Sequence, residues 1–420
     1  METLREKCAG LDIHRSTIMA CVLCSDPAGP VSKTIKSFVA TVKGITELVA
    51  WLRGFGVSHV GMEGTGVYWM PIYMALEATE WATPIVGNAR HIKQVPGRKT
   101  DVKDAEWIAQ LTRFGLIRPS FIPPRPIRAL RDLTRYRRTL VEVQASERRR
   151  LIKQLEATDM KLAEVLSDVF GVSGRAILLA LIEGEKTPAE MAELARGLAR
   201  KKRGELIEAL AGQLDAHHRM LLAIQLRRIE DTEQQIKQLN AEIEVHVRPY
   251  RTQMRLLISI PGIDRVGAAA ILAEIGPDMS AFATSDHLCS WGGLCPGNNE
   301  SAGKSKGGGA RPGNTWLKTA LCNAAISAIH TKDSFLRAKY YSLKPRIGGG
   351  KAALAIGRRI LACIWHMFTD GTLYEERGAV SLDRRTQERT VKRYSKKLDK
   401  LGFTVVPKPP PEEAGHMCAA

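Results

Sequence analysis

Apolar and polar residues alternate in two different rhythms over the first third of the chain. Strand-like apolar runs are predicted at residues 11–23, 31–40, 58–64 and 82–89. Residues 43–56 and 68–79, which lie between these runs, have apolar positions at helical spacing. Strands that alternate with helices predict an α/β domain, and we expect its boundary near the proline-rich segment 119–126.

The middle of the chain has the pattern of long helices. One is predicted from Ile127 to about Leu166, and another covers residues 221–247. Between them, Thr187 and Glu190 match the two polar members of a capping box. The second long helix has apolar residues at Leu226, Ile229, Ile236, Leu239 and Ile243. This spacing predicts a coiled-coil arm whose partner is either the same chain or another copy.

The last third combines an apolar hairpin with a glycine-rich basic stretch. Residues 256–276 contain two helical patterns around Pro261–Gly262, which suits either a phosphate-binding helix-hairpin-helix or a plain αα-hairpin. Residues 292–314 lack the strand and GK[ST] order of a P-loop, and they predict a mobile loop near phosphate. A helix is expected at 315–330. The chain is basic beyond Thr390, and its end is expected to be disordered.

Composition and charge indicate which kind of partner the protein binds and where it is located. The 420 residues are enough for about three domains, and their formal net charge of +18 favours a polyanion such as nucleic acid. The first residues lack an apolar signal core and no run is long enough to cross a membrane, so we expect a cytoplasmic protein. The eight cysteines are widely spaced apart from Cys21 and Cys24, which favours free thiols over a structural zinc site.

Four acidic residues are candidates for chemistry. Thr100 can cap a helix in which Asp101 and Asp104 share one face of the first turn, although the helix dipole alone would also favour acids there. Asp12 lies early on the first predicted strand, and Glu63 ends a central strand. If all four meet at one sheet edge, their mutual repulsion calls for cations, and carboxylate oxygens suit Mg²⁺ or Mn²⁺. Such sites perform phosphoryl transfer.

A row of arginines marks the first long helix. Arg128, Arg131, Arg135 and Arg138 recur at intervals of three and four residues, so they form one basic stripe. Contact with phosphate and simple exposure to solvent explain such a stripe equally well.

Several motifs in order resemble the DEDD-type insertion-sequence transposases, the serine-bearing group described as RNA-guided recombinases. They are GLDIHRST, MEGTGVYW, PGRKTDVKDAEWIAQL, GLIRPSFIPP, IRALRDLTRYRRTLV, DVFGVSGRAIL and IPGIDRVGAAAILAEIG. The resemblance covers the chain up to about residue 370. It implies an RNase H-like (RuvC-like) domain at 1–126, a helical coiled-coil linker at 127–250, and a mainly α C-terminal transposase domain at 251–375. The basic tail 376–420 follows it.

The same resemblance assigns roles to particular residues. It implies that Asp12, Glu63, Asp101 and Asp104 bind the metal and that Ser301 is the nucleophile, although Ser305 lies close enough to be confused with it. Basic residues near the serine become candidates for nucleic-acid contact with the arginine stripe: Lys304, Lys306 and Arg311. Implied partners are donor and target DNA, a guide RNA from the mobile element, and further copies in a dimer or tetramer. The two parts of the active site can come from different subunits in such proteins, and the protein is expected at the nucleoid when it is bound to DNA.

Three functions therefore compete. The first is a recombinase that combines the metal-bound acids with Ser301. The second is a metal-dependent nuclease of the junction-resolving type, which leaves no protein bound to DNA. The third is a non-catalytic nucleic-acid scaffold, in which the acids are only helix caps and strand ends.

Overall fold

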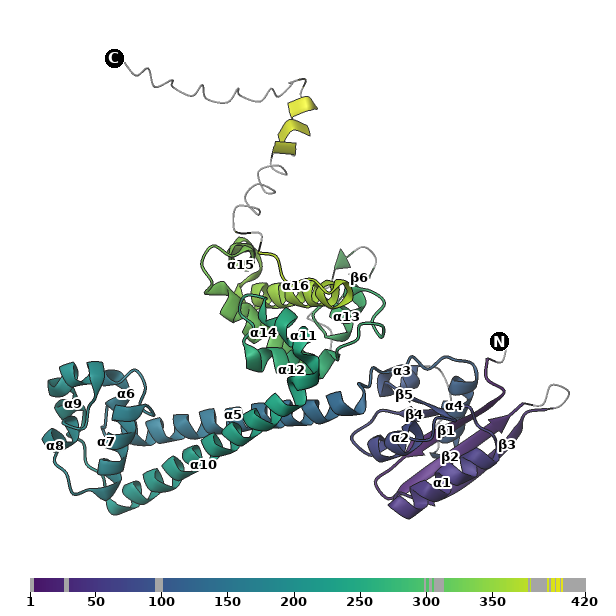
Figure 1. Ribbon diagram of the computed structural model, residues 1–420, viewed down its shortest axis with the longest axis horizontal. Helices are drawn as coiled ribbons and strands as arrows, with labels where there is room; N and C mark the ends of the chain where they lie inside the picture. The colour runs from purple at the N-terminus through teal and green to yellow at the C-terminus, as the bar shows by residue number, and fades with distance from the viewer. Residues whose placement is uncertain are drawn as a thin grey trace. The chain divides into compact units, whose positions relative to one another are not determined.

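The computed structural model describes most of the chain, in two compact units, Met1–Ile122 and Pro123–Ala420 (Figure 1). The described residues are 4–25, 30–94, 101–297, 300–301, 304–305, 313–376, 378, 391–392, 394–396, 398–400 and 402. Each unit is considered by itself below.

The N-terminal unit is built on a five-stranded mixed sheet with the order β3-β2-β1-β4-β5. The strands are β1 (Lys7–Ile13), β2 (Thr17–Cys24), β3 (Ser32–Val39), β4 (His59–Glu63) and β5 (Thr83–Gly87). Strands β1, β2 and β3 are antiparallel, whereas β4 and β5 run parallel to β1. The last three strands agree with the prediction.

The single strand predicted at residues 11–23 is wrong. The apolar run is interrupted by the polar residues His14, Arg15 and Ser16, where the chain reverses and the His14 N–H donates to the Thr17 carbonyl at 2.9 Å. The resulting hairpin pairs β1 with β2 over its whole length, from Lys7 opposite Cys24 to Ile13 opposite Ile18.

Helices cover both faces of this sheet. Helices α1 (Val42–Gly54) and α2 (Trp69–Glu77) bury Leu48 and Leu76 against Leu11 on one face. Helix α4 (Asp101–Arg113) packs Ala105 and Ala109 against Cys8 on the other face. The short α3 (Ala89–Gln94) follows β5. Side chains on successive strand residues therefore alternate between the two cores, as the pleat requires.

Two long antiparallel helices lie side by side in the second unit (Figure 1). Helix α5 (Arg125–Ala157) packs along α10 (Ala216–Val247), and the pairs Arg137 with Asn240 and Arg148 with Glu233 show the opposite directions. The predicted arm thus has its partner in the same chain. The first helix does not continue to Leu166, because the chain leaves it after Ala157 and Asp159 adopts a φ of 59°.

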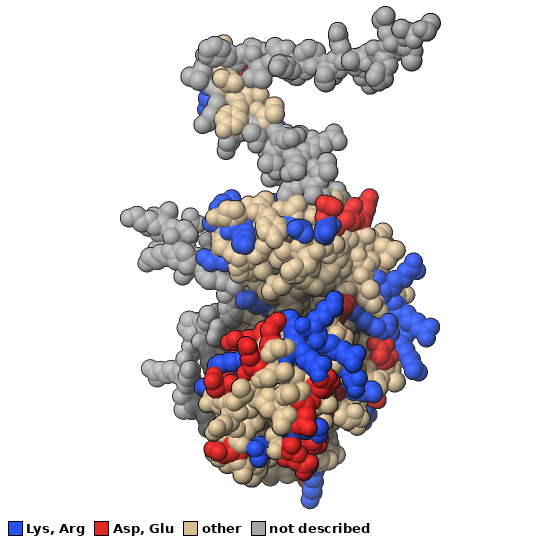
Figure 2. All heavy atoms as spheres, turned by 90° about the vertical axis from the view of Figure 1, so that its left-hand side faces the viewer, with Lys and Arg blue, Asp and Glu red and all other residues tan. Residues whose placement is uncertain are grey.

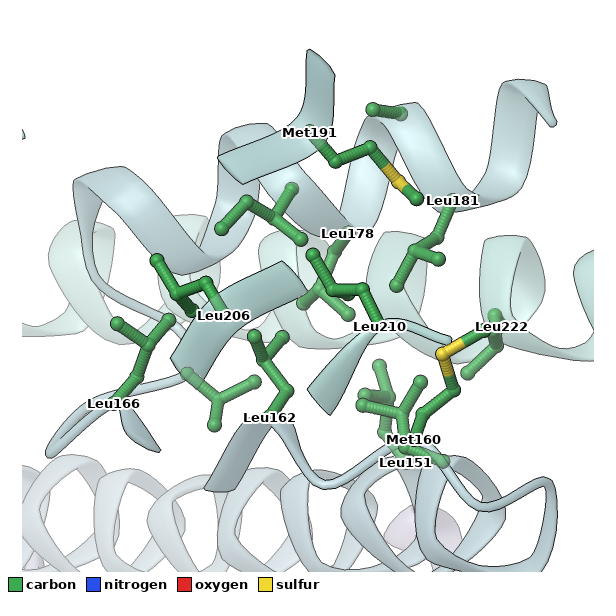
Figure 3. Packing of buried hydrophobic residues seen from close by; sticks show 14 of the residues in the cluster. Leu151, Met160, Leu162, Leu166, Leu178, Leu181, Met191, Leu206, Leu210 and Leu222 are labelled. Carbon is green, nitrogen blue, oxygen red and sulfur yellow. The ribbon is translucent and has the colours of Figure 1, made fainter. Parts of the chain in front are cut away.

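Short helices between α5 and α10 enclose a separate apolar core. They are α6 (Leu162–Val165), α7 (Val172–Glu183), α8 (Pro188–Ala192), η1 (Gly197–Lys202) and α9 (Arg203–Ala209). Leu162, Leu178 and Leu206 meet Leu151 of α5 and Leu222 of α10 in this core (Figure 3). The predicted capping box is confirmed: the Glu190 N–H donates to Thr187 Oγ1, and Glu190 accepts from the Thr187 N–H.

The rest of the second unit is mainly helical. Its elements are η2 (Arg248–Tyr250), α11 (Arg251–Ile258), α12 (Arg265–Ile275), α13 (Ser285–Trp291), β6 (Glu300–Ser301), β7 (Lys304–Ser305), α14 (Thr315–Ile329), α15 (Phe335–Ile347) and α16 (Gly349–Asp370). The turn between α11 and α12 needs glycine, since Gly262 has a φ of 87° and a Cβ there would lie 2.4 Å from the Ala324 carbonyl oxygen.

Three further observations bear on the predictions. The glycine-rich stretch holds two short antiparallel strands, β6 and β7, where only a loop was expected. The described cysteines form no disulfide with one another. None of the described helices is long and apolar enough to cross a bilayer.

Candidate active site

Asp12 and Glu63 lie at the carboxyl ends of neighbouring parallel strands. Leu11 pairs with Met62 in the register of β1 with β4, so Asp12 and Glu63 are the next residues on adjacent strands. Gly10 and Gly61, two residues earlier, both face α4. Because side chains alternate along a strand, Asp12 and Glu63 also belong to the α4 side of the sheet.

Helix α4 brings its first turn to the same edge. It runs antiparallel to β1: Arg5 Nη1 donates to the Thr112 carbonyl at 2.7 Å, and the Cys8 thiol donates to the Ala109 carbonyl at 3.5 Å. A Cβ on Gly10 would lie 2.4 Å from the Ala105 carbonyl oxygen. Continuing this direction, the start of α4 lies level with the end of β1.

That start carries the remaining two acids. Asp101 is the first residue of α4, and Asp104, three residues later, is half-buried. The side chain of Asp101 lies outside the described residues. The fold therefore brings the backbone positions of all four predicted acids to one edge of the sheet.

Asp12 and Glu63 have hydrogen-bond partners at this edge. Asp12 Oδ2 accepts from His14 Nε2 at 3.0 Å, and Glu63 accepts a hydrogen bond from the Thr65 hydroxyl. His14 was not among the predicted site residues, although its place two positions after Asp12 was a signal for it. Carboxylate oxygens at one sheet edge fit a hard divalent cation.

A different group comes nearest to a metal-binding arrangement among the described residues. Asp215, His217 and His218, at the start of α10, have ligand atoms within 4.8 Å of one another, whereas the described acids of the N-terminal unit form no such group. His218 has a structural role, because its Nδ1 accepts from the Asp215 N–H and closes the capping box of α10.

Ser301 lies on β6 in the second unit, opposite Lys304 of β7. Ser305 is opposite Glu300 in the same short pair. The side chains of these residues, like Lys306 and Arg311 as a whole, lie outside the described residues, so the structure does not separate the two serines.

The two ends of the serine-bearing segment meet. A Cβ on Gly313 would lie 2.4 Å from the Gly293 nitrogen, so the backbones before and after the segment are in direct contact. Asn314, the next residue, caps α14 by accepting from the Trp316 and Leu317 N–H groups. The serine therefore lies on a closed loop with a fixed base.

Glu274 of α12 ties this base to α5. Its side chain is only 3% exposed, and its carboxylate accepts two hydrogen bonds of 2.8 Å from Arg135 and one of 2.6 Å from the Asn314 amide. Arg131 donates to the Glu274 carbonyl at 2.7 Å. Burial lowers the pKa of Arg131 to about 10, against the opposing effect of Glu274, so Arg131 stays charged at neutral pH.

These contacts change the interpretation of the arginine stripe. Arg131 and Arg135 bind Glu274, Arg138 pairs with Glu142 at 2.8 Å, and Arg128 donates to the Pro123 carbonyl at 3.0 Å. The stripe is not a uniform solvated face. Its central arginines hold α5 against α12, which a helical repeat in the sequence does not reveal.

The mixed sheet with acids at the ends of β1 and β4, followed by a mostly helical body, fits an RNase H-like DEDD domain with a helical C-terminal part. Comparison with known families agrees. A transposase model of the IS110 DEDD type matches residues 9–159, and a model for transposases of the IS116/IS110/IS902 family matches residues 254–341.

Two insertion-element proteins are similar to the chain. The "Insertion element IS900 uncharacterized 42 kDa protein" of Mycobacterium paratuberculosis is 26% identical over 407 residues, which cover 87% of this chain and 96% of the relative. The "Insertion element IS110 uncharacterized 43.6 kDa protein" of Streptomyces coelicolor is 31% identical over 179 residues, 41% of this chain and 38% of the relative. The chain belongs to the DEDD-type insertion-sequence transposases. Transposases bind DNA, and DEDD domains generally use divalent metal ions.

Proposed function

We propose that this transposase cuts and rejoins DNA by metal-assisted phosphoryl transfer with Ser301 as the nucleophile. The observation that carries the proposal is the meeting of Asp12, Glu63 and the first turn of α4 at one sheet edge. A helix that only needed acids near its N-terminus would not have to start beside two strand-end carboxylates.

The four acids would hold the metal. Asp12, Glu63, Asp101 and Asp104 offer hard oxygen ligands, for which Mg²⁺ or Mn²⁺ is the natural match. Bound there, the ion would supply Lewis-acid stabilisation of charge on the reacting phosphate. The close fit of Gly10 against α4 keeps β1 and α4, two of the three elements that carry the acids, at a fixed separation.

The proposed chemical step is a transesterification. The Ser301 hydroxyl loses its proton, a bond forms between Oγ and phosphorus, and the bond from phosphorus to a deoxyribose oxygen breaks. The leaving oxygen gains a proton. The covalent link conserves the phosphodiester energy, so the reverse reaction with another DNA end can rejoin strands. Gly293, Gly313 and Asn314 support this role because they fix the base of the segment that presents Ser301.

Guidance by an RNA from the same element completes the proposal. The net charge of +18 suits a protein that grips nucleic-acid backbones while base pairing supplies the specificity. Figure 2 shows Lys and Arg side chains gathered over part of the face that it draws, beside Asp and Glu side chains. Donor DNA, target DNA and further copies of the chain would be the other partners.

A denaturing gel tests the reaction. The protein is incubated with labelled element-end DNA, the element's RNA and Mg²⁺, and the products are separated after denaturation. We expect a covalent protein–DNA adduct that is lost in Ser301→Ala and kept in the matched variant Ser305→Ala. An adduct that survives in Ser301→Ala but not in Ser305→Ala transfers the role to Ser305. Cut DNA without an adduct means a nuclease, and uncut DNA means a scaffold.

A further inference from the structure

Helices α15 and α16 carry basic residues and almost no acidic ones. Residues 335–367 contain no Asp or Glu, but they contain seven basic residues: Arg337, Lys339, Lys344, Arg346, Lys351, Arg358 and Arg359. The apolar residues of α16, including Ile356, Ile360 and Ile364, are buried in the domain. The cations of the two helices are exposed or half-buried.

A cavity of about 580 Å³ lies between these helices. Lys339 of α15 and Arg358, Arg359 and His366 of α16 line it, and none of its lining residues is acidic. A concave site with only basic charged groups is suited to an anion.

Neighbouring contacts orient two of the basic groups. The Arg359 guanidinium lies over the Phe335 ring, 4.8 Å from its centroid. Arg358 pairs with Asp286 at 2.8 Å, but that carboxylate is 79% exposed and competes with water, so a phosphate can replace it at small cost.

An aromatic side chain accompanies the charges. Tyr341 is exposed, and Arg337 and Lys344 both lie against its ring, at 5.7 and 5.9 Å from the centroid. Basic groups interleaved with an exposed aromatic ring are typical of surfaces that bind nucleic acid, because the cations contact phosphates and the ring offers a face to a sugar or base.

We propose that the groove between α15 and α16 binds the phosphodiester backbone of a nucleic acid, with Lys339 and Arg359 as its main contacts. The proposal rests on the proposed function only in requiring that the chain acts on nucleic acid. It does not depend on Ser301, on the metal or on strand cleavage. The groove would bind the nucleic-acid backbone at a place that the sequence motifs did not indicate.

Salt-dependent binding tests it on the full chain with Ser301→Ala, so that cleavage plays no part. The groove variant carries both Lys339→Gln and Arg359→Gln. It is compared with a control variant that carries both Lys161→Gln and Lys186→Gln. The control removes the same charge from two lysines beside Asp159 and Glu183. Fluorescence anisotropy with a DNA duplex, and separately with an RNA duplex, measures the dissociation constant from 50 to about 300 mM salt.

We expect the groove variant to bind DNA more weakly and to lower the slope of log K against log salt by up to about 1.8, at about 0.9 per lost phosphate contact. A loss confined to the RNA duplex assigns the backbone to RNA. The charge-conserving pair Lys339→Arg with Arg359→Lys should retain the wild-type slope, which controls for misfolding. An unchanged slope with both duplexes, or an equal loss in the control, overturns the proposal.

Discussion

Replacing Glu274 by glutamine should uncouple the serine-bearing segment from the body of the second unit. The side chain keeps its size but loses its charge, and the 15% exposed Arg131 and the neighbouring Arg135 lose their carboxylate. Removing one partner of a buried ion pair costs about 3 to 5 kcal/mol, because the remaining charge stays desolvated. The Asn314 amide and Arg135, which now share two carboxylate oxygens, would have a single amide oxygen left as acceptor.

Glu147 provides a matched control on α5. It is 5% exposed, almost as buried as Glu274, but its partners Arg150 and Arg228 are 61% and 58% exposed. Water can solvate those arginines after Glu147→Gln, so the cost should be about 1 kcal/mol or less. At roughly 2 to 4 °C per kcal/mol for a unit of this size, Glu274→Gln should lower the melting temperature by at least about 6 °C, and Glu147→Gln by at most about 4 °C.

The functional readout separates positioning from plain stability. Below both melting transitions, Glu274→Gln should form the covalent DNA adduct much more slowly while it binds DNA with unchanged affinity. Glu147→Gln should match the wild type in both assays. If Glu274→Gln melts like Glu147→Gln, the ion-pair reasoning is wrong. If it loses stability but forms the adduct at the normal rate, Glu274 supports the fold and does not position the serine.

Three further predictions concern the acidic edge and its link to the serine. Gly10→Ala should destabilise the N-terminal unit by about 1 to 3 kcal/mol and stop cleavage, because the new Cβ would meet the α4 backbone at 2.1 Å. The control Gly54→Ala should be tolerated, since a Cβ at Gly54 has nothing within 4 Å. Chemical denaturation measures the stability of both variants, and the gel assay measures their cleavage. Asp104→Asn should abolish cleavage without lowering the melting temperature, because it relieves repulsion among carboxylates; a variant that melts lower and still cuts DNA would support the helix-cap explanation. Mixing Ser301→Ala with Asp12→Asn protein should restore part of the recombination if subunits share sites, and mixed oligomers without activity would show that each chain completes its own.

The strand ends were predictable because their causes are local. Glu63 follows a short apolar run and precedes Gly64, so both the strand and its end can be inferred from neighbouring residues. The hairpin between β1 and β2 was missed for a related reason: three polar residues in a long apolar run are a weak signal, yet they decide where the chain reverses.

The Glu274 contacts could not be predicted in the same way. Arg135 and Glu274 are 139 residues apart, and nothing in the pattern around either residue indicates the other. The repeat of arginines on α5 is real, but periodicity only shows that they share a face. Whether that face meets solvent, phosphate or a buried carboxylate depends on packing between distant segments.

The division of the chain at Ile122 makes the two halves of the proposed site separable. The acids depend on the contact of Gly10 with α4, entirely within the first unit, whereas the base of the serine segment depends on Glu274, Arg135 and Asn314, entirely within the second. A defect in one network should therefore leave the other intact. Glu274→Gln protein should retain the wild-type affinity of the acidic edge for Mn²⁺, and Gly10→Ala protein should lose it. Loss of Mn²⁺ binding in both variants would mean that the two units fold as one cooperative body.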